Sequence, residues 1–267
     1  MIRDITIGQY YPAKSPIHRM DPRTKLFGTL IFIISVFLFH SVAGYAVATL
    51  FLAGMIIISQ VPVKFIFKGL KAIFMILMIT MVFNILLTPG EVLWKIGIFK
   101  ITREGISMAV RMAIRLVYLV IGSSLMTLTT TPNQLTDGLE KSLRPLNKIH
   151  IPVHEIAMMM SIALRFIPIL LEETDKIMKA QIARGADFES GNLIQKVKNM
   201  VPLLVPLFIS AFRRASDLAM AMEARCYHGG DNRTQMKPLH YTRRDHIAYV
   251  VLFVYLAVAI GFRVMGW

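Results

Sequence analysis

Hydrophobic residues are gathered in long runs that short polar segments separate. From Leu26 to Ile58 no residue carries a formal charge, and a His-Ser pair followed by glycine interrupts this run in the middle. Because a membrane span needs about 20 apolar residues and such polar-glycine signals mark turns, the run predicts two spans. With the later apolar runs, the chain is predicted to be an all-α membrane protein with about five transmembrane helices. The predicted spans are about 26–40, 42–59, 72–87, 106–131 and 247–265.

Two helix starts are marked by capping residues. Asp21 precedes Pro22 in the polar leader, and an aspartate cap with proline at the first helical position favours a helix start. Thr131, Pro132 and Gln134 form the pattern of a capping box after the fourth span. The first signal predicts the start of span one, and the second predicts a further helix on the polar side of the membrane.

The segment between spans four and five contains that short helix, to about Lys148, and two long amphipathic helices. Pro152 precedes the first long helix, and Ser190-Gly191-Asn192 separates it from the second. Each has an apolar stripe that recurs every three or four residues, as one face of a helix does. In the first helix the stripe consists of Ile156, Met160, Ala163, Ile167, Leu170, Thr174, Ile177 and Gln181. In the second it consists of Leu204, Phe208, Ala211, Ala215, Leu218 and Met222.

Charged residues and prolines interrupt both long helices, so we expect them to lie along or beneath the membrane. An alternative makes 156–171 and 200–212 true spans, which gives seven, but both runs are shorter than about 20 residues. The predicted organisation is a leader with four spans (1–131), a three-helix region (132–245) and a last span (246–267). The interrupting residues are Arg165, Pro168, Glu172, Glu173, Pro202, Pro206, Arg213 and Arg214.

Both long helices end in the same short sequence motif. The residue that continues each apolar stripe at the helix end is an arginine, Arg184 in the first helix and Arg225 in the second. An arginine offers five donors suited to carboxylates and carbonyls, and small neighbours leave room for another backbone to approach. The alternative is that each arginine only complements the helix dipole, with Gly185 as the stop signal. The repetition favours a docking role for the two phrases Ala183-Arg184-Gly185 and Ala224-Arg225-Cys226.

The distribution of basic residues predicts on which side of the membrane each terminus lies. The net charge is +14, yet the chain is 55% hydrophobic, and its basic residues flank the apolar runs. This pattern favours anionic lipid headgroups, rather than nucleic acid, as the groups that the basic residues contact. Five Lys or Arg stand in the leader, none between spans one and two, three in each of the next two gaps, and sixteen before the last span. The N-terminus is therefore predicted inside the cell and the C-terminus outside, in a multi-pass protein of the cell membrane.

Motifs for catalysis or metal binding are missing from the sequence. It contains no Walker A pattern, no acidic pair spaced for magnesium-diphosphate chemistry and no serine elbow. His150 and His154 have helical metal-ligand spacing, but Pro152 between them would break that geometry. Arg111 and Arg115 lie in span four, where we favour lipid or backbone partners over a translocation site. No catalytic residue, metal or cofactor is expected in this chain.

Four sequence features together resemble the EcfT/CbiQ family, the T components of energy-coupling factor (ECF) transporters. They are the leader Ser15-Pro16-Ile17-His18-Arg19-Met20-Asp21-Pro22-Arg23-Thr24-Lys25, the segment Thr129-Thr130-Thr131-Pro132, the segment Ala163-Leu164-Arg165-Phe166-Ile167-Pro168 followed by Glu172-Glu173, and the paired arginine phrases. The resemblance covers nearly the whole chain. Cys226 departs from it, because glycine is common at that position in the family.

The resemblance implies a non-catalytic subunit that couples two ATP-binding-cassette ATPases to a membrane-embedded S component, which binds the vitamin or other micronutrient. ATP would be bound by the ATPases. The three helices of 132–245 would be coupling helices, and Ala183, Arg184, Gly185, Ala224, Arg225 and Cys226 would dock on the ATPases. The apolar stripes would contact the S component, and the residues expected to do so are Met160, Ala163, Ile167, Leu170, Leu204, Phe208 and Ala211.

Other function classes are disfavoured by the residues. A self-sufficient secondary transporter needs ionisable residues inside its spans, and carboxylates are missing there. A conventional ABC permease remains an alternative, whereas an intramembrane enzyme is disfavoured by the missing motifs. The sequence does not identify the transported substrate.

Overall fold

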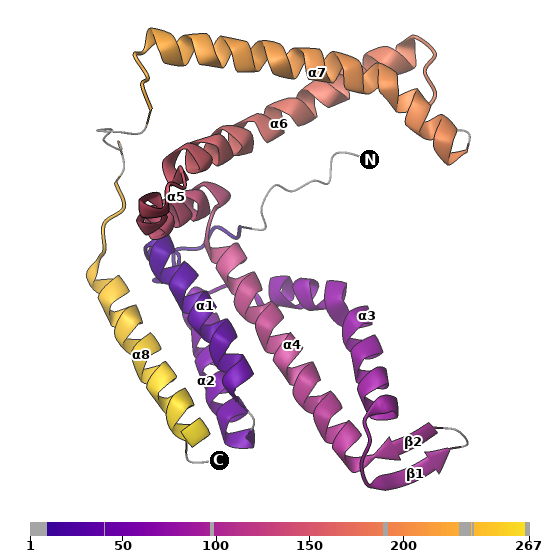
Figure 1. Cartoon of the computed structure of the whole chain (residues 1–267), viewed down its shortest axis with the longest axis vertical. Helices are drawn as coiled ribbons and strands as arrows, with labels where there is room; N and C mark the ends of the chain where they lie inside the picture. The colour runs from indigo at the N-terminus through magenta and orange to yellow at the C-terminus, as the bar shows by residue number, and fades with distance from the viewer. Residues whose placement is uncertain are drawn as a thin grey trace. The chain divides into compact units, whose positions relative to one another are not determined.

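The computed structural model describes residues 10–39, 41–96, 99–188, 192–229, 236 and 238–264. Its contacts divide the chain into two compact units, and the elements of both are labelled in Figure 1. One unit contains Gly8–Gly138 and Leu239–Trp267, and the other contains Leu139–Pro238 with the first residues of the chain.

The first unit contains all five predicted spans. Its elements are α1 (Pro22–Leu38), α2 (Val42–Ser59), α3 (Val63–Leu87), β1 (Val92–Ile96), β2 (Phe99–Thr102), α4 (Arg103–Thr129), the start of α5 (Pro132–Leu143) and α8 (Arg243–Val264). Helix α1 packs against α4 and α8, and α3 packs along α4. The core of this unit is an apolar cluster of Phe32, Val36, Phe39, Tyr45, Ala48, Leu52, Tyr255 and Ala259.

Both predicted capping signals are confirmed. The Asp21 carboxylate accepts a hydrogen bond from the backbone N–H of Arg23 at 2.9 Å, and Pro22 is the first residue of α1. At α5, Gln134 N donates to Thr131 Oγ1, and Thr131 N donates back to Gln134 Oε1, both at 3.3 Å. The reciprocal pair satisfies two backbone donors that the first turn of a helix leaves without partners.

Helix α3 and the segment after it differ from the sequence expectation. The helix begins at Val63 instead of near residue 72, and it bends by 57° between its parts Val63–Lys71 and Ile73–Leu87. Lys64, Lys68 and Lys71, which stand in the predicted gap before the third span, therefore lie within the first part of this helix. Strands β1 and β2 then pair antiparallel, with Lys95 opposite Lys100, and this hairpin was not predicted. Its cross-strand hydrogen bonds satisfy backbone groups that a bare loop would leave to water.

The second unit contains the two long helices. After a 3₁₀ turn η2 (Arg144–Ile149), its helices are α6 (Val153–Ala183) and α7 (Leu193–Ala224), which pack across one another (Figure 1). Arg214 of α7 donates to the Glu173 carboxylate of α6 at 2.9 Å. The prolines that the sequence suggested as interruptions lie inside these helices, so each removes a single backbone donor without ending the helix.

Four helices in the described part of the chain are long and apolar enough to span a membrane: α2, α4, α6 and residues Arg243–Phe262 of α8. A fifth is obtained if bent α3 counts as one span. An all-helical membrane protein with four to five candidate spans is thus confirmed. The set differs from the expected one, because α1 has only 17 residues and α6, expected beneath the membrane, has an apolar window of sufficient length.

Candidate helix-end docking site

Helix α6 ends in a hydrogen-bonded motif around Arg184. Arg184 is the C-terminal cap, and Gly185 follows with a φ of +89°. Gly185 N donates to Ile182 O at 2.9 Å, and Ala186 N donates to Gln181 O at 3.0 Å. These two bonds define a Schellman motif, which pairs the last carbonyl groups of the helix with backbone amides.

Helix α7 ends in the same motif. Arg225 is its C-terminal cap, and Cys226 follows with a φ of +55°. Cys226 N donates to Glu223 O at 2.8 Å, and Tyr227 N donates to Met222 O at 3.0 Å. The two phrases that the sequence singled out therefore have matching backbone geometry, although one has a cysteine where the other has glycine.

Backbone amides cap these carbonyls, so the two arginine side chains are not needed for that task. Arg184 and Arg225 are both exposed. Within the part of the chain that the structure describes, neither guanidinium belongs to an ion pair. A Cβ added at Gly185 would have open space around it, so the positive φ, rather than close packing, explains glycine there. Ala183 and Ala224 are exposed as well, which leaves both ends accessible to a partner.

The residues of the two stripes are also accessible. Phe208 is 60% exposed, and the exposure of Met160, Ile167 and Leu204 lies between 38% and 41%. Ala163 is exposed, whereas Leu170 and Ala211 are half-buried. Large apolar side chains at this exposure mark lipid-facing or partner-facing surfaces in a membrane protein.

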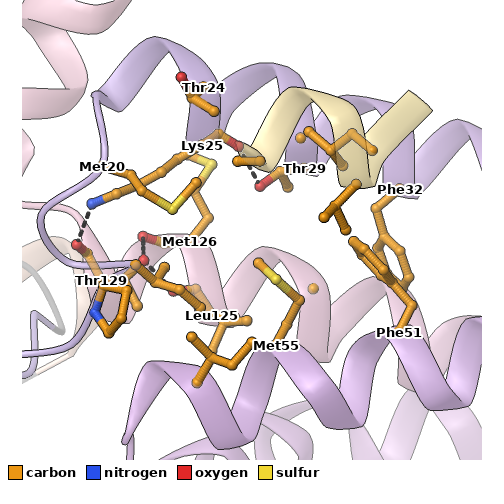
Figure 2. A pocket seen from close by; sticks show the side chains of 18 of the residues that line it. Met20, Thr24, Lys25, Thr29, Phe32, Phe51, Met55, Leu125, Met126 and Thr129 are labelled. Atoms are coloured by element: carbon orange, nitrogen blue, oxygen red, sulfur yellow. Dashed lines mark hydrogen bonds between the residues drawn. The ribbon is translucent and has the colours of Figure 1, made fainter. Parts of the chain in front are cut away.

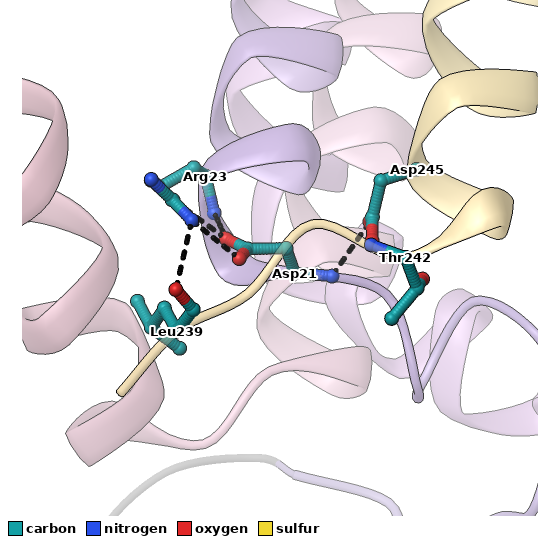
Figure 3. Close-up of polar contacts among 5 residues, drawn as sticks. All are labelled: Asp21, Arg23, Leu239, Thr242 and Asp245. Carbon is teal, nitrogen blue, oxygen red and sulfur yellow. Dashed lines mark hydrogen bonds and ion pairs between the residues drawn. The ribbon is translucent and has the colours of Figure 1, made fainter. Parts of the chain in front are cut away.

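A cluster of polar residues joins the leader to the start of α8 (Figure 3). Asp245, which is fully buried, accepts a hydrogen bond from Asp21 N at 2.8 Å and two more from Thr242 N and Oγ1. Arg23 pairs with Asp21 at 2.9 Å and donates to Leu239 O at 3.4 Å. Sequence reasoning recognised Asp21 as a cap but missed Asp245, because no local pattern shows that residues 224 positions apart meet.

His18 holds the leader together through hydrogen bonds to Ser15 and Tyr11. Its Nε2 lies 2.9 Å from Tyr11 O, which can only accept, so Nε2 donates and Nδ1 accepts from Ser15 Oγ at 2.7 Å. Burial lowers the pKa of His18 from its ordinary 6.5, and the charge of Lys25 lowers it further, against the bond to Tyr11. The leader thus holds a neutral imidazole.

The intramembrane arginines and the histidine pair have different surroundings. Arg115 donates to the backbone carbonyl of Phe39 at 3.3 Å and to Tyr45 OH at 3.4 Å, a backbone partner of the kind that we favoured. Arg111 is exposed. His154 contacts the Glu140 carboxylate at 2.9 Å, and the described residues contain no group of three potential metal ligands.

Comparison with known proteins gives full-length matches. The family model for CbiQ, described as a cobalt transport protein, matches residues 13–236. The energy-coupling factor transporter transmembrane protein EcfT of Clostridium kluyveri is 57% identical over 99% of this chain and 98% of that protein. The EcfT proteins of Ruminiclostridium cellulolyticum and Bacillus subtilis are 55% and 49% identical, over 96% and 98% of this chain and 96% and 100% of their own lengths.

Proposed function

The chain belongs to the EcfT family, the transmembrane components of energy-coupling factor transporters, and we propose that Arg184 and Arg225 transmit ATPase movement into its membrane helices. As a member of this family it is a non-catalytic membrane subunit of an ECF transporter. The proposed partners are two ABC ATPases at the helix ends and a membrane-embedded S component that binds a vitamin or another micronutrient. ATP would be bound by the ATPases, and no cofactor is assigned to this chain.

The observation that carries this proposal is the repeated geometry of the two helix ends. Both arginines are exposed caps of long helices, and both are followed by a residue of positive φ in the same hydrogen-bonding pattern. A helix is stiff along its axis, so a load applied at its last turn is carried along its length. The two long helices pack together and are joined by the Glu173–Arg214 ion pair. They therefore offer two helix ends at which an ATPase can apply a load.

We further propose that the apolar stripes of α6 and α7 form the surface for the S component. Their methionines are unbranched and can repack against partners of different shape. In this arrangement α6, α7 and the short α5 are coupling helices. The stripe residues remain half-buried or exposed in the structure of the isolated chain, which is compatible with such a contact.

The test is ATP-driven uptake by the complete transporter in proteoliposomes with Arg184→Ala, Arg225→Ala and the double variant. Removing one partner of a buried hydrogen-bonded charge pair costs about 2–5 kcal/mol, which weakens docking by more than about tenfold. Uptake should fall sharply in each single variant and vanish in the double variant. Lysine at either position should rescue poorly, because a point charge does not reproduce the planar fork of arginine.

The matched control is Arg213→Ala, which removes an exposed arginine from the middle of α7. It should leave uptake near the normal rate. Abundance of the subunit in the membrane should hardly change in any variant, since backbone amides cap both helices. Near-normal uptake by the double alanine variant at equal expression would mean that the docking role is wrong and that both arginines only interact with the helix dipole.

A further inference from the structure

A cavity of about 310 Å³ lies among α1, α2, α4 and α8 (Figure 2). Most of its wall is apolar, formed by side chains such as Met20, Phe32, Phe51, Met55, Leu125 and Met126. The volume is at the lower end of the range of about 300–1,000 Å³ that is typical of ligand pockets. Water gains few hydrogen bonds from such a wall, so an apolar occupant is favoured.

One end of the cavity is cationic. Lys25 lines this end, and its Nζ donates to Thr129 O at 2.8 Å and to His18 O at 3.3 Å (Figure 2). An ammonium group has three donors, so one remains after these two bonds. Arg244, in the first turn of α8, also lines the cavity. Among the described residues, no carboxylate lies within ion-pair distance of either cation, although Asp21 and Asp245 interact with Lys25 electrostatically from farther away.

The cationic end lies at the polar boundary of this unit. The Asp21–Asp245 contact brings the start of α1 level with the start of α8, and the Lys25–Thr129 bond brings the end of α4 to the same level. Beyond this level the apolar cores of the helices begin. An anion held at Lys25 and Arg244 would thus stand where phospholipid headgroups stand, with the cavity extending toward the hydrocarbon.

The cavity also opens sideways onto the outer apolar surface. Three of its lining residues are strongly exposed, namely Ile58 of α2 at 49% and Ile247 and Val251 of α8 at 64% and 48%. In a membrane this side faces lipid chains. An occupant can therefore enter from the bilayer without crossing the packed core of the unit.

We propose that this cavity binds one acyl chain of an anionic phospholipid whose phosphate group is held by Lys25 and Arg244. Each part of the lipid meets the part of the cavity that matches its chemistry. The acyl chain covers apolar side chains, and the phosphate gives a direct anionic partner to two cations that belong to no ion pair within the described part of the chain. The bound lipid would fill the space between the four helices, and it is independent of the role proposed for the helix ends.

The test uses the full-length chain in neutral detergent, equilibrated with equal amounts of phosphatidylglycerol and phosphatidylcholine of identical acyl chains. Native mass spectrometry then counts the retained lipid molecules. We expect one phosphatidylglycerol to be retained in preference to phosphatidylcholine. Arg244→Gln should lower this preference roughly fivefold, since a basic side chain near an anionic headgroup contributes about 1 kcal/mol. The adjacent Arg243→Gln, which changes an exposed arginine outside the cavity wall, is the matched control.

A second pair of variants tests the apolar part. Met55→Trp should fill the cavity and reduce retention of both lipids, whereas Met75→Trp, on the exposed face of α3, should not. Thr29→Leu provides another cavity-filling change if Met55→Trp does not fold. Equal retention of the two lipids with no difference between the two arginine variants would overturn the headgroup assignment. Unchanged retention in the filled variants would overturn the cavity itself as the site, as would recovery of a compound other than a phospholipid.

Discussion

At the residue scale, Cys226 occupies a position that suits glycine. Its φ of +55° lies in the left-handed region, where a side chain costs about 1–2 kcal/mol relative to glycine. The matching position in α6 is Gly185, with a φ of +89°. The end of α7 therefore carries backbone strain that the end of α6 does not.

Cys226→Gly should consequently stabilise the last turn of α7 by about 1 kcal/mol, and Gly185→Ala should destabilise the last turn of α6 by a similar amount. Hydrogen exchange of the amides that close each motif measures this directly. Opening at Tyr227 should become roughly fivefold rarer in the first variant. Unchanged exchange there would mean that the cysteine is accommodated without strain.

His18 makes the leader sensitive to acid. The neutral ring is favoured in the folded state because its pKa is lowered below 6.5 by burial and by Lys25. The folded state therefore binds fewer protons, and the stability that His18 contributes is complete above about pH 6.5 and is lost as the pH falls through the folded-state pKa. Exchange rates of the leader amides, corrected for intrinsic pH dependence, should rise between pH 7.5 and 5.5. His18→Gln should remove most of this pH dependence, whereas the exposed His240→Gln should retain it.

Residue-level prediction from sequence succeeded where chemistry is local. The Asp21 cap, the Thr131–Gln134 box and the ends of both long helices each depend on neighbours within a few positions. The Asp245 anchor and the Arg115 bond to Phe39 O depend on packing between distant helices, so periodicity and capping rules could not find them.

At the element scale, helix existence followed from hydrophobic pattern, but helix boundaries did not. The third apolar run predicts only the second part of α3, because the lysines near its start resemble a connecting segment. The hairpin β1–β2 is too short to show a clear alternation. The prolines within α6 and α7 were expected to interrupt these helices. A long helix tolerates the loss of a few hydrogen bonds when the helical segments before and after each proline are well formed.

The stripes give the prediction at this scale. Replacing Ile167 and Phe208 with aspartate should release the S component from the purified complex while the ATPases remain bound, because two charges would have to be buried at the apolar contact. Co-purification measures both partners at once. As a control, aspartate at Ile209, which is 51% exposed on α7 outside the predicted contact set, should retain the S component. Loss of the ATPases instead would assign the stripes to the other partner.

At the scale of the whole molecule, the distribution of basic residues predicts the N-terminus inside and the C-terminus outside. A cysteine at position 240 should react with a membrane-impermeant reagent only from the cytoplasm, and one at position 266 only from the exterior. Position 266 lies outside the described residues. Cys226 is exposed and must first be replaced by glycine so that it does not react. Reaction of both positions from one side would exclude five spans.

The contact between Asp21 and Asp245 has a consequence for the order of synthesis. The two residues are 224 positions apart, so the Asp21 amide has no native acceptor until α8 has been made. At about 5–20 residues per second, this delay lasts roughly 10–45 s. During this time the start of α1 is held only by contacts with earlier elements, such as the Lys25–Thr129 bond. A chain arrested before α8 would lack the second anchor, so closure of this contact distinguishes a chain that contains α8 from one that does not.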